Sequence, residues 1–294
     1  EQPVPLAEPL LLDVPSGTPF NRLAVMLEQQ GVVERSLWLK LYGRLNPRMS
    51  RIKAGEYELA PGMTVLGLIG AMVRGDVKHW SIQFIEGWTF KDMRAALARA
   101  ERLRKTTTDW TDEQVMAALG AAGEHPEGRF FPDTYLFTSA DSDLDLLRRA
   151  YTRMESVLAE EWANRKDGLP YETPYEALIM ASIVERETGV PEERDEVAGV
   201  FVRRLQKGMR LQTDPTVIYG MGEKYKGRIG ARDLRTYTPY NTYRIPGLPP
   251  TPIALPGREA IHAALHPDDG DSLYFVARGD GTHKFSRTLA EHQK

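Results

Sequence analysis

The alternation of short apolar runs, turns and helical segments constrains the fold of this chain more than any other sequence feature. Three times before residue 100, an alternating or apolar run leads through a turn containing glycine into a segment with helical periodicity. The runs are LLLDV at 10–14, EYEL at 56–59 and the stretch 80–85. Their spacing is too irregular for a solenoid repeat. The pattern therefore predicts an α+β protein.

The first two of these units predict a small N-terminal module at 11–78, preceded by a proline-rich linker at 1–10. We expect a βααβ-like arrangement. Thr18 is a candidate N-cap, Pro19 the first helical residue and Gly31 the end of the first helix. A second helix is expected at 36–45, and Thr64 should cap a third at 65–73.

The remaining residues, 79–294, predict a larger mixed α+β domain. Amphipathic helices are expected at 143–165 and again after residue 191, followed by a short helix at 258–267 and a hairpin that turns at 279–281. Residues 211–257, which lie between the helix expected after residue 191 and the short helix at 258–267, are rich in tyrosine, proline and glycine. Such a long irregular stretch in a compact domain is usually functional, and its aromatic residues argue against disorder.

Composition excludes several classes of function. The formal net charge is −3 and the pI is near 6.1, so no basic face for nucleic acid is expected. The chain has no cysteine, which excludes disulfides, thiolate catalysis and cysteine-ligated metals. No apolar run approaches the roughly 20 residues of a membrane span. Because the chain begins with Glu1 rather than Met, we expect a fragment or processed form, and a targeting or anchor segment is compatible with that.

Two glutamates at the end of a strongly apolar helix are the most unusual local feature. In the stretch ASIVERETGV (181–190), Glu187 follows Ile183 and Val184 at helical spacing and shares their face, whereas Glu185 points roughly to the opposite side. The competing interpretation is that both are ordinary solvated residues of the last helical turn. Because a helix C-terminus disfavours carboxylates, two acids there need another reason. The functional interpretation is a carboxyl group in an apolar wall, with a raised pKa suited to general acid catalysis on a glycosidic bond.

The irregular stretch downstream offers side chains that would line a saccharide cleft: Gln212, Asp214, Tyr219, Tyr240, Asn241 and Tyr243. Arg194 and Arg210 are further candidates, for peptide carboxylates of a substrate. The other charges at 195–204 are interpreted as a solvated helix face.

Other patterns are better explained without a specific function. His262 and His266 have the spacing of a helical metal pair, but the sequence offers no HExxH motif and no obvious third ligand. The acidic cluster at 268–271 does not match a calcium-binding loop. The GxG at 220–222 lacks the context of a nucleotide-binding loop. We expect neither a metal ion nor a cofactor.

Long blocks of the chain closely resemble the YceG-like endolytic murein transglycosylases. They include AGEYEL, EGWTF, GRFFPDTYLF, the stretch from ASIVERETGV to VIYGMG, YNTYRIPGLPPTPIALPG and SLYFVARGDGTHKFSRT, and together they span essentially the whole chain. The resemblance implies an enzyme that cuts peptidoglycan glycan strands internally, with Glu187 as its catalytic glutamate. The pair Glu187-Thr188 is also similar to the Glu-Ser signature of other lytic transglycosylases.

The same resemblance implies further properties. The N-terminal module resembles a LysM domain, a peptidoglycan-binding unit. Family members are held in the bacterial inner membrane by a single N-terminal helix, absent from this sequence, with the remainder on the periplasmic side. Peptidoglycan is the implied substrate, and penicillin-binding proteins of the cell-wall synthesis machinery are candidate partners. The implied mechanism uses one carboxyl group and leaves 1,6-anhydro-muramyl ends.

Two alternatives stay open at this point. One is a non-catalytic peptidoglycan-binding scaffold, which would have no need to bury an unpaired acid. The other is a hydrolytic muramidase, which would need a second carboxylate to activate water or act as a nucleophile. Glu185 and Asp214 are the candidates for that second carboxylate.

Overall fold

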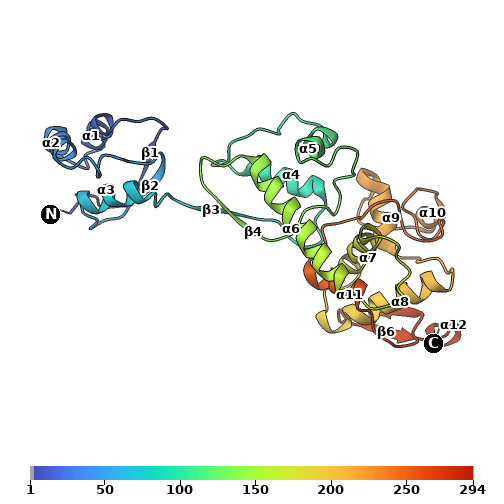
Figure 1. Cartoon of the computed structure of the whole chain (residues 1–294). Coiled ribbons are helices and arrows are strands. Elements are labelled where there is room, and N and C mark those ends of the chain that lie inside the picture. The colour runs from blue at the N-terminus through green and yellow to red at the C-terminus, as the bar shows by residue number, and fades with distance from the viewer. Residues whose placement is uncertain (1–2, 294) are drawn as a thin grey trace. The chain divides into compact units, whose positions relative to one another are not determined.

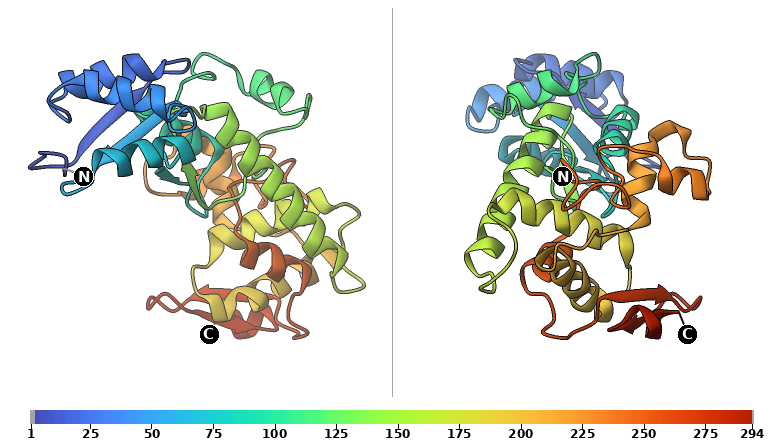
Figure 2. Two further views of the ribbon diagram at one scale, coloured as in Figure 1. Left: turned by 60° about the vertical axis from the view of Figure 1, so that its left-hand side comes forward. Right: turned by 90° about the vertical axis from the view of Figure 1, so that its right-hand side faces the viewer.

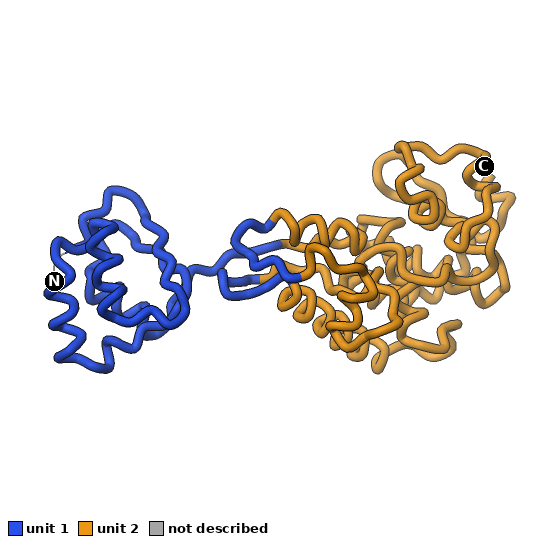
Figure 3. The backbone as a smooth tube through the Cα atoms, turned by 90° about the horizontal axis from the view of Figure 1, so that it is seen from above, with its two compact units in different colours: residues 1–82, 100–106, 136–143 blue, residues 83–99, 107–135, 144–294 orange. Residues whose placement is uncertain are grey.

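The computed structural model describes residues 3–293 and divides into two compact units (Figure 3). Unit 1 takes residues 1–82, 100–106 and 136–143, and unit 2 takes 83–99, 107–135 and 144–294. Each unit has its own cluster of buried apolar side chains. The division lies close to the predicted boundary at residue 78, but two later segments also belong to unit 1. The predicted domain limits therefore stay a prediction.

Unit 1 is built on a two-stranded antiparallel sheet (Figure 1). Strand β1 (Leu10–Val14) pairs with β2 (Gly55–Leu59) in a register that places Leu12 opposite Tyr57. Helices α1 (Phe20–Gln29) and α2 (Ser36–Leu45) connect the strands, and α3 (Val65–Arg74) follows them. The order β1–α1–α2–β2 agrees with the expected βααβ-like arrangement. The likeness to LysM stays a prediction.

The ends of the N-terminal helices correct two details of the sequence analysis. Thr64 caps α3 as expected, since its hydroxyl accepts from the Gly67 amide at 3.1 Å. Thr18 does not cap α1, because its hydroxyl donates to the Pro15 carbonyl at 2.7 Å within the preceding turn, and Pro19 is the N-cap. The linker prediction differs as well: Val4 is buried and its amide donates to Met63. Residues 1–2 of that prediction lie outside the described residues.

A second strand pair and two helices follow. Strand β3 (Trp80–Gln83) pairs with β4 (Thr134–Phe137), and the division between the two units falls within both strands. Helices α4 (Phe90–Arg99) and α5 (Asp112–Ala118) belong to unit 2. The start of α4 is fixed by the buried Glu127, whose Oε1 accepts from the Phe90 amide at 2.9 Å.

Helix α7 (Pro174–Glu187) is the centre of unit 2. Thr173 caps it, Pro174 occupies its first turn, and the eight residues 177–184 are all buried. It packs against α8 (Arg194–Gln206) and α11 (Arg258–Leu265), and the long helix α6 (Asp143–Ala163) adds Met154, Val157 and Leu158 to the same core (Figures 1 and 2). A helix buried on all sides has no separate apolar stripe. Ile183 and Val184, predicted to form an apolar face shared with Glu187, therefore belong to a segment that is buried on every side.

The tyrosine-rich stretch is more regular than expected. It contains α9 (Asp214–Met221), the 3-10 turn η2 (Gly222–Lys224) and α10 (Ala231–Arg235). Pro215 is compatible with α9 because it lies in the first turn, where no backbone donor is required. Outside these three elements, the tyrosine-rich stretch has turns and irregular backbone. Helix α8 begins after the 3-10 turn η1 (Pro191–Glu193).

The predicted C-terminal hairpin is confirmed. Strands β5 (Tyr274–Ala277) and β6 (His283–Ser286) pair antiparallel, and α12 (Leu289–His292) packs against both. Within residues 3–293, no helix combines the length and the apolar character needed to cross a bilayer.

Candidate active site

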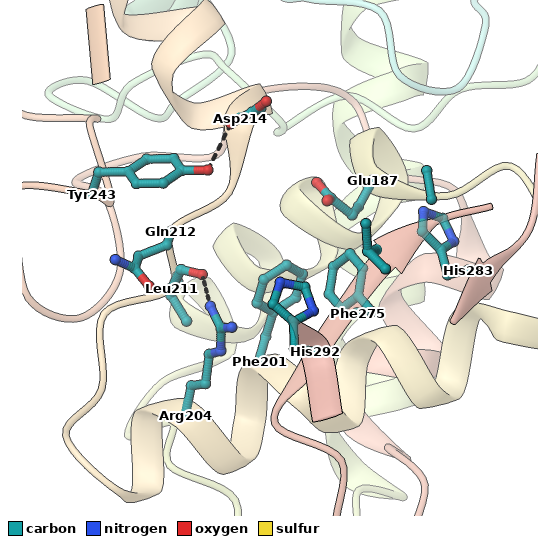
Figure 4. A pocket seen from close by; sticks show the side chains of 12 residues that line it. Glu187, Phe201, Arg204, Leu211, Gln212, Asp214, Tyr243, Phe275, His283 and His292 are labelled. Carbon is teal, nitrogen blue, oxygen red and sulfur yellow. Dashed lines mark hydrogen bonds between the residues drawn. The ribbon is translucent and has the colours of Figure 1, made fainter. Parts of the chain in front are cut away.

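Glu187 stands at the edge of a cavity of about 330 Å³ in unit 2 (Figure 4). The cavity is lined by α7, α8, the start of α9, the loop at 243 and the C-terminal hairpin. Its lining side chains are Glu187, Phe201, Arg204, Leu211, Gln212, Asp214, Tyr243, Phe275, Val276, Ala277, His283 and His292. Its size is at the lower end of the range for small-molecule sites. Four of the residues predicted from the sequence therefore meet here: Glu187, Gln212, Asp214 and Tyr243.

The carboxyl group of Glu187 is half-buried and held in place by one side chain. Its Oε2 accepts a hydrogen bond from the Thr213 hydroxyl at 2.7 Å. Desolvation raises the pKa of Glu187, and the Asp214 carboxylate raises it further. The Thr213 hydroxyl, and the electrostatic influence of His283 and Arg204, lower it. Since burial is the largest of these influences, Glu187 keeps its proton to a higher pH than a free glutamate does.

The turn before α9 positions Thr213. Gln212 has a φ of +52°, and among the described non-glycine residues it alone has a positive φ. The Thr213 amide donates to the Thr242 hydroxyl at 3.1 Å, and Thr216 closes a small buried network with both threonines. A non-glycine residue in this backbone region is strained, and such residues cluster at functional sites. The strained turn aims the Thr213 hydroxyl at Glu187.

Asp214 and Tyr243 form a second polar pair at the rim. The Tyr243 hydroxyl donates to the Asp214 Oδ1 at 2.7 Å, and both side chains lie on the same side of Glu187 in Figure 4. Asp214 is exposed, so its carboxylate is solvated. Desolvation and the hydrogen bond to this carboxylate raise the pKa of Tyr243, so its phenol stays neutral and donates.

A buried arginine lies on the wall of the cavity. Arg204 donates to the backbone carbonyls of Leu211 at 2.6 Å and Leu273 at 2.7 Å. The sequence analysis placed 195–204 on a solvated helix face, and for Arg204 that is wrong: only 8% of it is exposed. Its guanidinium joins backbone carbonyls of two separate segments, and it also places a fixed positive charge near Glu187.

On the other side of Glu187 lies His283 (Figure 4). The Glu193 carboxylate accepts from the backbone amide of His283 at 2.9 Å and contacts the ring Nδ1 at 2.7 Å. This contact joins strand β6 to η1.

The sequence analysis missed Thr213, Arg204 and His283. Only Thr213 had a signal, since it stands between two residues that were named.

The other predicted residues lie elsewhere. Glu185 accepts from the Gly257 amide at 3.0 Å and does not line this cavity. The Asn241 amide group donates to the carbonyls of 233, 234 and 236, so this buried side chain supports the loop. Tyr219 and Tyr240 line a different cavity. Arg194 and Arg210 are absent from the lining, and Arg210 donates to the Tyr243 carbonyl at 3.2 Å.

The histidine pair has a neighbour that the sequence did not reveal. Glu161 on α6 comes close to His262 and His266, with one potential ligand atom from each residue within 4.8 Å of the others. The same carboxylate binds the Arg258 guanidinium at 2.7 Å and the His262 ring at 2.9 Å. We interpret this group as an ion-pair cluster that ties α6 to α11.

Comparisons with known proteins agree over nearly the whole chain. The model of the YceG-like family matches residues 12–294. The chain is 32% identical to the endolytic murein transglycosylase of Bacillus subtilis, an alignment that covers 96% of this chain and 82% of the relative. It is 26% identical to the endolytic murein transglycosylase of Streptococcus pneumoniae strain D39, covering 95% of this chain and 57% of that longer protein.

A solved structure gives the same result for the fold. The crystal structure of a YceG-like protein from Listeria monocytogenes superposes with a TM-score of 0.61 at 30% sequence identity. The match covers 97% of this chain and 98% of the Listeria chain.

Proposed function

Because the chain belongs to the YceG-like family, we propose that it is an endolytic lytic transglycosylase of peptidoglycan. It cleaves the bond between N-acetylmuramic acid and N-acetylglucosamine within glycan strands. The observation that carries the proposal is the half-buried Glu187 carboxyl at a cavity, with its pKa raised by desolvation. A protonated carboxyl at neutral pH is what the first step requires.

In this mechanism Glu187 acts twice. It first gives its proton to the glycosidic oxygen as the bond from that oxygen to the anomeric carbon breaks. The resulting carboxylate then takes the proton of the sugar's own C6 hydroxyl, whose oxygen bonds to the anomeric carbon. A 1,6-anhydro ring closes, and no water is consumed. Thr213 and Arg204 would stabilise the carboxylate between the two steps, because one donates to it and the other places a positive charge near it.

The same geometry supports a hydrolytic muramidase as the second candidate. Asp214 lines the cavity and lies near enough to Glu187 to raise its pKa. A hydrolase would use such a second carboxylate. The structure favours the transglycosylase because Asp214 is exposed and already accepts from Tyr243. A binding scaffold is less favoured, since it gains nothing from a buried acid.

The test combines product analysis with two matched variants. Digestion of peptidoglycan by the unmodified chain should leave 1,6-anhydro-muramyl ends, each lighter by one water than a hydrolytic end. Glu187→Gln should fold and be inactive, whereas Glu185→Gln should keep substantial activity. Reducing muramyl ends in the mass spectrum would show that water had attacked. An active Glu187→Gln variant would remove Glu187 from the mechanism.

The setting of the enzyme is part of the proposal. By its family resemblance, the described part acts on the periplasmic side of the bacterial inner membrane, held there by a single N-terminal helix. Its LysM-like module binds glycan without chemistry. Penicillin-binding proteins, which extend the strands that this enzyme cuts, are the proposed partners.

A further inference from the structure

A second and larger cavity lies beside the first in unit 2, with a volume of about 680 Å³. We call it the Arg186 cavity. Its lining residues are Gly87, Thr89, Lys91, Asp92, Glu127, Arg186, Pro215, Ile218, Tyr219, Gly222, Glu223, Tyr240 and Ile253. The mechanism proposed above uses none of them. Two tyrosines that the sequence analysis assigned to a saccharide cleft, Tyr219 and Tyr240, lie here.

The two cavities share a partition. On α7, Arg186 lines this cavity and the next residue, Glu187, lines the catalytic one. On α9, Pro215 likewise lines the Arg186 cavity and its neighbour Asp214 lines the catalytic one. Adjacent residues are less than about 4 Å apart along the chain. Tyr219 lies roughly 9 Å along α9 from Thr213, which holds Glu187. A polymer that crosses the ends of α7 and α9 therefore reaches both cavities.

The lining combines apolar surfaces with buried polar atoms. The rings of Tyr219 and Tyr240 pack edge to face with their centroids 4.8 Å apart, next to Ile218 and Ile253. The Tyr219 hydroxyl donates to Glu127 at 3.0 Å, and the Tyr240 hydroxyl bonds with Thr251 at 2.9 Å. A pyranose ring has the matching character, because its axial hydrogens are apolar and its rim carries hydroxyl groups. Such mixed linings fix the orientation of small ligands.

Several charged side chains of the cavity already have partners within the protein. Lys91 forms an ion pair with Glu223 at 2.7 Å, and Arg186 donates to the Gly87 carbonyl at 3.1 Å. Asp92 accepts from the amide and hydroxyl of Thr89. Three carboxyl groups against two cations, one of them in an ion pair, make the cavity poorly suited to an anion. An uncharged sugar suits it better than the carboxylates of a peptide stem.

We propose that the Arg186 cavity binds N-acetylhexosamine units of the same glycan strand, away from the bond that is cut. This proposal rests on the proposed function. An enzyme that cuts inside a strand must hold sugars on both sides of the cleaved bond, and the two cavities provide two such places. Binding at the Arg186 cavity then selects long strands over short ones.

The experiment measures binding separately from cleavage. In the Glu187→Gln background, affinity is measured by calorimetry for peptide-free glycan strands, for peptide-bearing strands and for a tetrasaccharide of the same repeat. Ile218→Trp fills the Arg186 cavity with a larger ring. We expect it to weaken the binding of long strands by tenfold or more and to leave the tetrasaccharide unchanged. Leu136→Trp, at a position 58% exposed on β4 and outside both cavities, is the matched control.

A second blocking variant guards against misfolding. Lys91 also lines the Arg186 cavity, so Lys91→Trp places a larger ring there. It removes only an exposed ion pair, which contributes little to stability. Unchanged long-strand affinity in both blocking variants would overturn the proposal, and so would equal losses for long strands and the tetrasaccharide. If only peptide-bearing strands lost affinity, the cavity would bind the peptide stem instead. The proposed function is judged separately, because it fails only if Glu187→Gln still cleaves or the products are hydrolytic.

Discussion

At the scale of single residues, the proton affinity of Glu187 depends on two polar neighbours, Thr213 and Asp214. Thr213→Val keeps the shape of the side chain but removes the hydrogen bond that stabilises the carboxylate. Losing a hydrogen bond to a charged group costs about 1.5 kcal/mol or more, so the pKa of Glu187 should rise by roughly one unit. The pH–rate profile should move to higher pH by that amount. Thr236→Val, an exposed threonine outside both cavities, should leave the profile in place.

Asp214 should act in the opposite direction. Its negative charge raises the pKa of Glu187, so Asp214→Asn should shift the pH–rate profile to lower pH. A transglycosylase keeps most of its maximal rate in this variant, because the sugar supplies its own nucleophile. Loss of activity at every pH would instead make Asp214 the second catalytic carboxylate. The profiles of both variants are measured on the same soluble glycan strands.

The sequence predicted the site only in part, and the reason is physical. Glu187, Gln212, Asp214 and Tyr243 could be named because acids in apolar surroundings and aromatic loops have a chemical signature. Asn241 lies in the same tyrosine-rich stretch and was predicted for the same reason, but its side-chain amide donates to backbone carbonyls. Arg204 reads as an ordinary charged helix residue, and only the fold shows that its guanidinium is buried. Side-chain direction in a long loop depends on tertiary contacts that no local pattern contains.

At the scale of elements, Glu127 joins the start of α4 to α9 and brings a dependence on pH to the fold. It accepts from the Phe90 amide and from the Tyr219 hydroxyl. Burial raises the pKa of Glu127 from 4.5 to about 7. Because the folded state holds the proton more tightly, this group contributes stability that is present below pH 4.5 and is lost as pH rises through about 7.

Glu127→Gln should remove that dependence. We expect the free energy of unfolding of the original chain to fall, relative to the variant, by at most about 1.4 kcal/mol per pH unit across this range. Denaturant unfolding of both chains at several pH values measures the difference. Glu259→Gln, at an exposed position in α11, serves as the control and should follow the original chain. A constant difference between the original chain and Glu127→Gln would contradict the prediction.

Elements with strong local signals were predicted well. Helices α2, α6 and α8 and the C-terminal hairpin follow from periodicity and turn residues. Helix α9 was missed because its eight residues contain a proline and a glycine and stand within a stretch of turns. Its stability comes from tertiary contacts, since Thr216 and Val217 are buried. Short helices of this kind depend on packing rather than on propensity.

At the scale of the whole molecule, the cores of the two units come from separate parts of the sequence. The buried residues of the first core lie between Val4 and Met72, and those of the second between Phe131 and Leu265. A chain shortened to begin at residue 79 therefore keeps every buried side chain of the second core. It also keeps Glu187 and the whole lining of the catalytic cavity. This division makes the role of the N-terminal module testable by removing it.

We expect the shortened chain to cleave concentrated soluble glycan strands at a rate within a few-fold of the original. It should bind intact sacculi more weakly, because it lacks the N-terminal module that we propose to bind glycan. Pelleting with sacculi measures the binding, with Glu187→Gln introduced into both chains so that the sacculi stay intact. Cleavage of soluble strands by the unmodified active site is the control for folding. Equal pelleting of the two chains would remove the binding role from the N-terminal module, because the second unit alone would then account for attachment to the wall.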